Sequence, residues 1–224
     1  MFDQIAPTYD LANRIITLGL DLYWRRRMCH FLPSHPGLKL LDCATGTGDQ
    51  ILSFMKHSPR IVHAIGIDLA EEMLSLGREK IKRAGLASMV DLRVGSALAI
   101  PFPDNSFDCV TISFGIRNVT DVLLALQECF RVLRPQGRLL ILEGTIPKSK
   151  ALKSIHLFYL RHLLPRFGKW VSHHPSAYRY LNETIETFPH GNAFLQLMQQ
   201  AHFEPVIAHP LSGGISTIYQ GEKP

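Results

Sequence analysis

The stretch that decides the fold is Leu40-Leu41-Asp42-Cys43-Ala44-Thr45-Gly46-Thr47-Gly48-Asp49, and it is followed by Ile65-Gly66-Ile67-Asp68. Each stretch begins as a short apolar run; the first ends in a glycine-rich turn and the second in an acid. Asp68 comes 20 residues after Gly48, which is the spacing of a βαβ unit that holds an adenosine-type cofactor. In such a unit, small residues let the backbone approach the ligand, and the acid accepts hydrogen bonds from both ribose hydroxyls.

The details of the turn separate two classes of cofactor. A dinucleotide fingerprint needs a third glycine three residues after the second, where this chain has Ile51. Asp49, at the end of the turn, is a poor neighbour for a pyrophosphate at a helix N-terminus. S-adenosylmethionine has ribose and adenine but no phosphate, and its amino group suits an acid such as Asp42 or Asp49. The alternative is an ordinary tight turn of an α/β protein, which Asp68 makes less favourable.

Composition indicates one globular domain. The chain has 224 residues, of which 46% are hydrophobic and 19% charged, enough for one α/β domain with a real core. It has no run of 18 uncharged apolar residues and no apolar segment near the N-terminus, so we expect neither a transmembrane helix nor a secretory signal. The cysteines form no Cys-x-x-Cys pair, which favours buried thiols in a reducing cytoplasm over a zinc site. We therefore expect a cytoplasmic protein without a metal.

The net charge of +5 is concentrated in one segment. No acidic residue lies between Glu143 and Glu183, and that interval carries seven basic ones, so the rest of the chain sums to −2 (+5 less +7). The seven are Lys148, Lys150, Lys153, Arg161, Arg166, Lys169 and Arg179.

Strand and helix signals alternate along most of the chain. A helical signal covers Asp3 to His30, before Pro33, Pro36 and Gly37 break the chain. Strands are then predicted over 38–43, 61–67, 90–94, 107–113 and 137–142, and helices over 50–57, 71–84 and 121–133. This alternation predicts a parallel sheet with helices on both faces.

After Thr145 the pattern changes. Helical signals cover 148–164, a stretch around 184–187, and 192–201, and two β runs over 206–211 and 215–219 are joined by Ser212-Gly213-Gly214, a hairpin signal. The whole pattern predicts the α/β fold of class I S-adenosylmethionine-dependent methyltransferases, with a Rossmann-like, seven-stranded, mostly parallel sheet whose last strand is antiparallel. We expect a single domain over 1–224, with an N-terminal helical cap over 1–36 and a helical lid or substrate segment over 146–200.

Four local signatures lie along nearly the whole chain. They are Phe2–Asp10 with Asn13 and Trp24-Arg25-Arg26; the Leu41–Asp49 turn; Ser113–Asp121; and Tyr178-Arg179-Tyr180-Leu181 with Ile185, Phe188-Pro189 and Gly213-Gly214-Ile215. Together they resemble the ubiquinone/menaquinone biosynthesis C-methyltransferase family. The third signature is highly specific to that family, whereas class I methyltransferases in general share only the second.

The chain departs from the family pattern at three places. Thr45-Gly46 stands where the family usually has Gly-Gly or Cys-Gly, and Asp21 where it often has His. After Glu143, Gly144-Thr145 replaces the family's Phe-Ser. The last two departures are expected on the substrate side, so they concern the choice of substrate and not the class of reaction.

The resemblance implies where the cofactor binds. The implied contacts are Thr47 in the turn, Asp68 on the ribose, Ser96 and Ala97 beside the adenine, and Ser113 toward the methionine portion. The chemistry of the turn itself adds Gly46 and Gly48, which let the backbone approach the cofactor, and Asp42, which suits its amino group. Independent support is that ligands of open α/β sheets bind beyond the carboxyl ends of the strands. For Ser96 or Ser113 alone, a strand-end capping role is the alternative.

The resemblance also implies the reaction: C-methylation of a prenylated quinol, demethylmenaquinol to menaquinol in the favoured interpretation, with S-adenosylhomocysteine as product. The alternatives are a ubiquinone-pathway benzoquinol, another small molecule, or a non-catalytic cofactor-binding scaffold. A nicotinamide-dependent dehydrogenase is disfavoured by Asp49 and Ile51.

Catalysis of this kind needs a group that stabilises a phenolate-like oxygen and a group that accepts a proton. Arg117 and Asn118 suit the first task, because a guanidinium and an amide donate hydrogen bonds to a developing oxyanion. Tyr9 would orient the ring or relay the proton. The alternatives are a surface salt bridge of Arg117 with Asp121 and plain helix packing of Tyr9. Histidines of the basic segment are possible bases, but we interpret them as surface groups: His156, His162, His173 and His174.

Apolar and basic residues interleave between 148 and 164. One interpretation is a lid whose apolar face covers an isoprenoid tail while its cations meet anionic lipid headgroups at the membrane surface. The other is a helix packed on the sheet with a solvated charged face. RNA binding is disfavoured, because Phe114-Gly115-Ile116-Arg117 stands where a base-flipping loop would follow the fourth strand. We expect a lipophilic quinol as partner and no nucleic acid; a homo-oligomer stays open.

Overall fold

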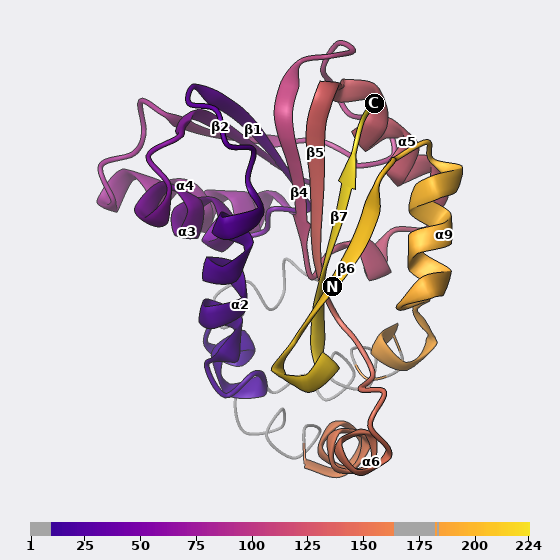
Figure 1. Ribbon diagram of the computed structural model, residues 1–224. Coiled ribbons are helices and arrows are strands. Elements are labelled where there is room, and N and C mark those ends of the chain that lie inside the picture. Colours follow the sequence, from indigo (N-terminus) through magenta and orange to yellow (C-terminus); the bar gives the residue numbers. More distant parts are fainter. Residues whose placement is uncertain (1–9, 164–181, 183) are drawn as a thin grey trace.

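The computed structural model describes residues 10–163, 182 and 184–224. One seven-stranded sheet, in the order β3-β2-β1-β4-β5-β7-β6, forms its centre (Figure 1). The strands are β1 (Leu38–Cys43), β2 (Ile61–Asp68), β3 (Val90–Val94), β4 (Phe107–Ser113), β5 (Leu133–Gly144), β6 (Val206–Leu211) and β7 (Ser216–Glu222). The strands β1 to β5 pair in parallel, whereas β7 is antiparallel to both β5 and β6. The predicted mostly parallel sheet, its antiparallel last strand and the terminal hairpin are confirmed.

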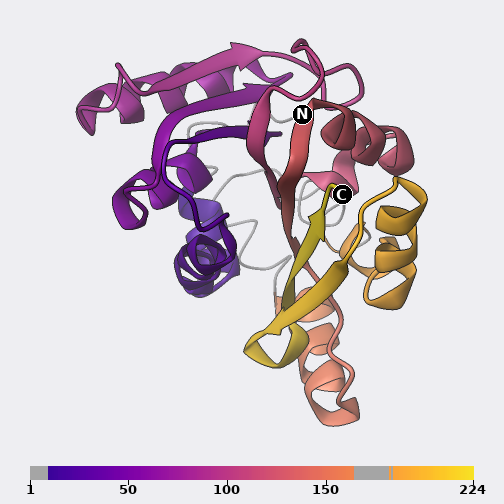
Figure 2. The same cartoon turned by 45° about the horizontal axis from the view of Figure 1, so that its top comes forward.

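Helices cover both faces of the sheet. One face carries α2 (Leu20–Met28), α3 (Asp49–His57) and α4 (Glu71–Arg83), and the other carries α5 (Val122–Val132) and α9 (Asn192–Gln200). Figures 1 and 2 show these two groups on opposite sides of the strands, with α6 (Lys150–Phe158) beyond one end of the sheet. Within the described residues, no helix is both long and apolar enough to cross a membrane.

The core has two layers because side chains of a strand alternate between its faces. On β1, Leu40 packs in the cluster that contains Trp24 of α2 and Phe54 of α3. Its neighbour Leu41 packs in the opposite cluster, with Leu126 of α5 and other residues from α5 and α9. Strands buried on both faces explain why the sequence shows nearly continuous apolar runs there.

The helix predicted over Asp3–His30 is wrong as one continuous element. Residues 10–16 are helical, but Leu18 (φ 52°) and Gly19 (φ 77°) adopt left-handed backbone conformations. Such conformations end a helix, so α2 starts anew at Leu20. The helix predicted over 148–164 likewise starts later, at Lys150, and continues as a π-helical turn, η3, over Tyr159–Leu163.

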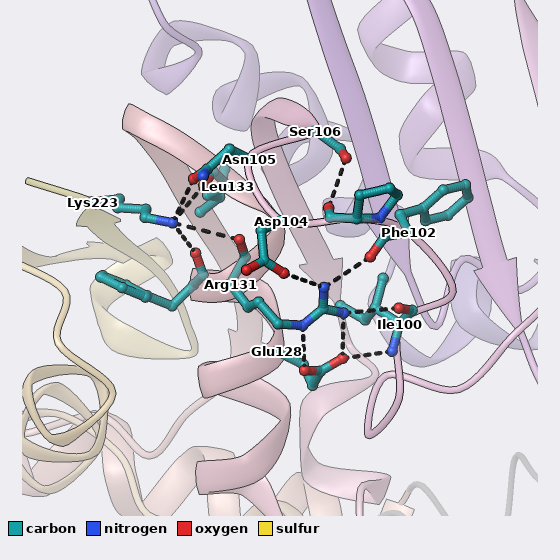
Figure 3. A network of polar contacts seen from close by, with 11 residues as sticks. Ile100, Phe102, Asp104, Asn105, Ser106, Glu128, Arg131, Leu133 and Lys223 are labelled. Carbon is teal, nitrogen blue, oxygen red and sulfur yellow. Dashed lines mark hydrogen bonds and ion pairs between the residues drawn. The ribbon is translucent and has the colours of Figure 1, made fainter.

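The helix predicted over 121–133 is confirmed with slightly different bounds. Asp121 caps it, since its Oδ1 accepts a hydrogen bond from the Leu124 amide at 2.9 Å. Its other end is held by a side chain from the far end of the chain (Figure 3): Lys223 Nζ donates to the carbonyls of Phe130 at 2.9 Å and Leu133 at 2.8 Å. These carbonyls have no partner within the helix, so the tail of the chain fastens α5 to the sheet.

Arg131 fixes the loop that leads into β4, as Figure 3 shows. Its guanidinium donates to Glu128, to Asp104, and to the carbonyls of Ile100 and Phe102, at 2.7 to 2.9 Å. One side chain thereby joins Glu128 of α5 to three partners on a turn that the sequence marks with two prolines.

Candidate active site

A cavity of about 340 Å³ lies at the carboxyl ends of β1, β2, β3 and β4. Its walls include residues 44 and 46, 68–70, 95–98, 113–115 and 118–120. Among the described residues none of its lining side chains is a lysine, arginine or histidine, and its one acid is Asp68. The walls therefore suit a ligand without phosphate, because no cation is placed to neutralise one.

Asp68 is held with its carboxylate at the edge of this cavity. Its Oδ2 accepts a hydrogen bond from the Gly46 amide at 2.8 Å, and its Oδ1 accepts one from the Ala70 amide at 2.9 Å. Each oxygen keeps a further lone pair. The carboxylate is thus fixed in orientation and still able to accept bonds from a diol.

The glycine-rich turn needs its glycines. Gly46 and Gly48 have φ values of 56° and 76°, in the left-handed region where a side chain is strained. Gly46 lines the cavity. Gly48 does not; it precedes α3 and lets that helix start directly after the turn.

Asp42 lies beneath the turn and outside the cavity lining. Its two carboxylate oxygens accept bonds from the hydroxyls of Thr45 at 2.6 Å and Thr111 at 2.5 Å. Complete burial raises the pKa of Asp42 to about 6, although the two hydroxyls oppose that shift. The structure therefore places this acid as a brace between β1 and β4.

Thr47 and Asp49 belong to a charged cluster behind the turn. The Thr47 hydroxyl donates to Asp10 at 2.7 Å, and Lys80 contacts Thr47, Asp10 and Asp49. Arg14 also donates to Asp49, at 2.6 Å. Burial alone would raise the pKa of Asp49, but Lys80 and the nearby arginines lower it below its usual range. The cluster ties the N-terminal helical segment to the turn.

The residues predicted to flank the adenine and the methionine portion do lie in the cavity. Ser96 and Ala97 line it after β3, and Ser113 lines it at the end of β4. The Ser113 hydroxyl is 3.1 Å from Gln50 Oε1, to which it donates. Ser96 also caps its own turn by accepting from the Leu98 amide at 3.1 Å.

A second cavity, of about 290 Å³, adjoins the first. Phe114 lines both. The second cavity is enclosed by residues from the N-terminal segment, α2, α6 and the turn after β4, and most of them are apolar. Trp24 lies 6.2 Å from the Phe114 ring, and the Arg25 guanidinium lies over that ring at 5.4 Å. The space suits an apolar ring next to the first ligand.

The short 3-10 turn η2 (Ile116–Asn118) serves both cavities. Ile116 is fully buried and anchors the turn in the core. Arg117 lines the second cavity, and Asn118 lines the first. Two consecutive polar side chains thus face two different ligand spaces.

Arg117 pairs with Glu143 and not with Asp121. Its Nη1 donates to Glu143 Oε1, which also accepts from the Gly144 amide at 2.8 Å. Glu143 is fully buried. Within the described part of the chain, Arg117 Nε, Glu143 Oε2 and Asn118 Oδ1 are buried without a hydrogen-bond partner. Buried polar atoms of this kind are costly unless a ligand or water satisfies them.

The interpretation of His156 as a surface group is wrong. This histidine is only 9% exposed and lines the second cavity, because α6 packs its inner face over the N-terminal segment. His162 is exposed, as predicted. His173, His174 and Tyr9 lie outside the described residues.

Two residues of the second cavity, Asp21 and Phe114, were not among the predicted catalytic or cofactor-binding residues, although Asp21 was expected on the substrate side. Asp21 is almost fully buried; it accepts from the Thr17 hydroxyl at 2.8 Å and pairs with Arg14. The sequence feature that pointed to Asp21 as a residue of the substrate side is its position just before the Trp24-Arg25-Arg26 cluster, where the family often has His. Phe114 carries a positive φ of 59°, which no sequence pattern announces.

The residues present fit S-adenosylmethionine. A fixed carboxylate, an unpartnered amide oxygen on Asn118, apolar walls such as Leu69 and Val119, and the lack of a lining cation match an adenosine with a sulfonium. The described residues contain no group of three or more His, Cys, Asp or Glu side chains that could hold a metal ion.

Solved structures with a similar fold include SAM-dependent methyltransferases. A SAM-dependent methyltransferase from Thermotoga maritima superposes with a TM-score of 0.70 at 20% identity, over 100% of this chain and 98% of that one. A SAM-dependent methyltransferase from Aquifex aeolicus superposes with a TM-score of 0.61 at 18% identity, over 91% of each chain. At these identities the likeness shows the fold alone.

Sequence relatives are closer. The chain is 41% identical over 223 residues to a ubiquinone/menaquinone biosynthesis C-methyltransferase UbiE of Geobacter sulfurreducens, covering 100% of the chain and 87% of the relative. It is 38% identical over 224 residues to a demethylmenaquinone methyltransferase of Bacteroides fragilis, covering 100% and 91%. The model of the ubiE/COQ5 methyltransferase family matches residues 1–223. With its sheet, its two adjoining cavities and this match, the chain belongs to the ubiE/COQ5 methyltransferase family.

Proposed function

We propose that the chain transfers a methyl group from S-adenosylmethionine to a ring carbon of a prenylated quinol, with demethylmenaquinol as the substrate. The observation that carries the proposal is the mostly apolar second cavity, which shares Phe114 with the nucleoside cavity and contains Arg117. The names of the relatives support it: one is a ubiquinone/menaquinone biosynthesis C-methyltransferase and another a demethylmenaquinone methyltransferase. Family membership makes the chain an S-adenosylmethionine-dependent methyltransferase of quinone biosynthesis.

In this proposal, Asp68 accepts the ribose hydroxyls, Ser96 and Ala97 flank the adenine, and Ser113 faces the methionine portion. Asn118 Oδ1 is an acceptor for an adenosine N–H. When bound, S-adenosylmethionine supplies a methyl group already activated by its sulfonium. The protein then needs mainly to align a carbon nucleophile with that group, which is a proximity effect.

Arg117 has the main polar role on the substrate side. Glu143 holds one side of the Arg117 guanidinium and so fixes the orientation of a side chain that lines the second cavity. A guanidinium stays protonated at all working pH values and donates to an oxyanion. We therefore assign Arg117 to the oxygen that becomes phenolate-like on the quinol. Tyr9 remains a candidate for orienting the ring.

Transfer of labelled methyl from S-adenosylmethionine to a panel of reduced demethylated naphthoquinols and benzoquinols tests the proposal. We expect product with a demethylated prenyl naphthoquinol, and at least tenfold lower kcat/KM with the benzoquinol. A preference for the benzoquinol would move the chain to the ubiquinone pathway. No transfer to either ring would favour the cofactor-binding scaffold.

The rim of the second cavity suits contact with a lipid surface. Leu18 (77% exposed), Ile155 (67%) and Phe158 (57%) present large apolar side chains. Near them, Lys150 and Lys153 are exposed on α6, as is Lys148 just before it. Each cation near an anionic surface contributes about 1 kcal/mol, screened by salt over about 8 to 10 Å. We infer weak, reversible docking that gives a lipophilic quinol access to the cavity.

Co-sedimentation with vesicles tests the docking. We expect binding to anionic vesicles at low salt, loss at high salt, and weak binding to neutral vesicles. The double substitution Lys150→Glu/Lys153→Glu should abolish it, whereas Lys82→Glu on α4, at the far side of the molecule in Figure 1, should not. Equal binding to anionic and neutral vesicles would contradict the proposed docking.

A further inference from the structure

His156 is a buried histidine of the second cavity whose ring has no hydrogen-bond or ion-pair partner among the described residues. It lies on α6, 9% exposed, with its side chain on the cavity wall. An imidazole without a partner on a cavity wall is free to form a hydrogen bond with a ligand there.

The other charged or titratable groups that line this cavity are poorly suited to accept a proton. Arg117 and Arg25 are guanidiniums and stay protonated. Asp21 is held by the Thr17 hydroxyl and by Arg14. The Tyr159 hydroxyl donates to the Ile16 carbonyl at 2.7 Å, and burial raises its pKa.

Burial also fixes the protonation state of the histidine. Desolvation by burial lowers the pKa of His156 below its ordinary value of 6.5. The ring is therefore neutral near pH 7. A neutral imidazole has one nitrogen with a free lone pair, and that lone pair is what a general base requires.

We propose that His156 accepts the proton of the quinol hydroxyl next to the reacting carbon, and so acts as the general base of methyl transfer. The inference rests on the proposed function and deepens it. The two residues then have separate roles in the second cavity: His156 removes the proton of the hydroxyl, and Arg117 stabilises the negative charge on the remaining oxygen.

The proton balance closes without another reagent. The hydroxyl proton moves to the imidazole, and its electron pair flows through the ring. The ring carbon bonds to the methyl carbon while the C–S bond breaks, with its electron pair remaining on sulfur. The methylated carbon then loses its own hydrogen as a proton to water, and the imidazolium returns its proton to the ring oxygen. One proton is released for each methyl transferred, and His156 ends neutral.

The test compares His156→Phe and His156→Gln with the wild-type enzyme and with His57→Gln, an exposed histidine at the end of α3 that lines neither cavity. The substrate is a short-chain demethylmenaquinol kept reduced. At pH 7 we expect a loss of about 100-fold in kcat for both His156 variants, the low end of general base catalysis. His57→Gln should retain wild-type activity.

The pH profile separates catalysis from packing. Wild-type kcat should be level near neutral pH and fall on acidification below the ordinary imidazole pKa of 6.5, because the imidazole then becomes protonated. In His156→Phe this acid limb should disappear, and the residual rate should rise with pH as the quinol ionises unaided. An acid limb that persists in the variant would assign it to another group such as Asp42, and would overturn the proposal.

Two further readouts complete the design. Calorimetric titration with S-adenosylhomocysteine should give unchanged affinity in both variants, since His156 lies outside the nucleoside cavity; an equal loss of affinity would mean a structural role. Added imidazole should restore activity to His156→Ala in proportion to its free-base fraction. A wild-type enzyme inactive on every quinol would refute the proposed function, whereas active variants with wild-type profiles would refute only this inference.

Discussion

Two acids of the glycine-rich turn show how environment sets the role of a single residue. Asp42 and Asp49 are seven positions apart in the sequence. Asp42 is buried between two hydroxyls with no cation in contact, and its pKa is raised. Asp49 is in contact with Lys80 and Arg14, and its pKa is lowered. The two carboxyls therefore affect the free energy of unfolding with opposite pH dependence.

Asp42→Asn and Asp49→Asn test this opposition. The raised pKa of Asp42, about 6 against 3.8, means that its contribution to stability is greatest below about pH 4 and is lost as pH rises through 6, by up to about 3 kcal/mol. Asn at 42 should therefore gain stability relative to wild type between pH 4 and pH 7. Asn at 49 should be less stable than wild type above about pH 4, and this difference should shrink as pH falls below 4, because ionised Asp49 stabilises the fold above its unfolded pKa and that contribution is lost on acidification. Urea denaturation at several pH values measures both, and parallel slopes would contradict the assignment.

Asp68 carries the residue-scale prediction for the cofactor. Asp68→Ala removes charge-assisted hydrogen bonds, so we expect affinity for S-adenosylhomocysteine to fall by roughly 1.5 to 3 kcal/mol. The control is Asp91→Ala, which removes a part-exposed acid of β3 that pairs with Arg93. This substitution should leave the affinity for S-adenosylhomocysteine unchanged. Calorimetric titration with S-adenosylhomocysteine and with NADH decides it. Unchanged affinity would place the ribose elsewhere, and binding of NADH alone would contradict the methyltransferase.

At the scale of elements, the turn η2 connects the two cavities. Its three residues face the core, the second cavity and the first cavity in turn. A loop that follows a buried parallel strand can do this because its backbone is fixed at the strand end, so each side chain has one direction. Consecutive substitutions on this turn should therefore have separable effects.

Arg117→Ala and Asn118→Ala form the matched pair. We expect Arg117→Ala to leave the affinity for S-adenosylhomocysteine within about twofold and to lower methyl transfer by about 100-fold or more, the cost of losing an oxyanion donor. Asn118→Ala should weaken binding of S-adenosylhomocysteine by about 1 kcal/mol. Equal loss of binding and turnover in Arg117→Ala would mean that the Arg117–Glu143 pair is structural, since breaking a buried pair destabilises by about 3 to 5 kcal/mol.

The sequence predicted the elements better than it predicted the second cavity. Alternation of strands and helices, the glycine-rich turn and the acid at Asp68 are local patterns, so the sheet and much of the nucleoside cavity follow from them. His156, Glu143 and Phe114 have no local pattern that marks them as site residues. Their roles depend on α6 crossing the N-terminal segment and on a left-handed backbone at Phe114, and such contacts between distant parts of the chain are not encoded in spacing. The break at Gly19 was missed because an amphipathic helix can restart in phase after a turn.

At the scale of the whole molecule, the last residues fasten distant parts together. Lys223 joins the end of α5 and the Asn105 turn, to which it donates at 2.9 Å. Lys223→Met keeps the apolar stem and removes the donors. We expect the free energy of unfolding to fall by about 1 to 2 kcal/mol, as a lower urea midpoint with an unchanged slope. Lys82→Met, at an exposed position of α4, serves as the control, and an equal shift there would refute the special role of Lys223.

The sheet order has a consequence for how the protein is made. During translation, β5 leaves the ribosome well before β7, yet in the folded sheet β7 lies between β5 and β6. Until residues 216–222 leave the ribosome, the edge of β5 has no partner from its own sheet, and β6 has no place to pair. An open edge strand is a template for pairing with other chains. A messenger RNA truncated just before the codons of β7 should therefore yield a chain that aggregates, because the five parallel strands then keep an unpaired edge at β5.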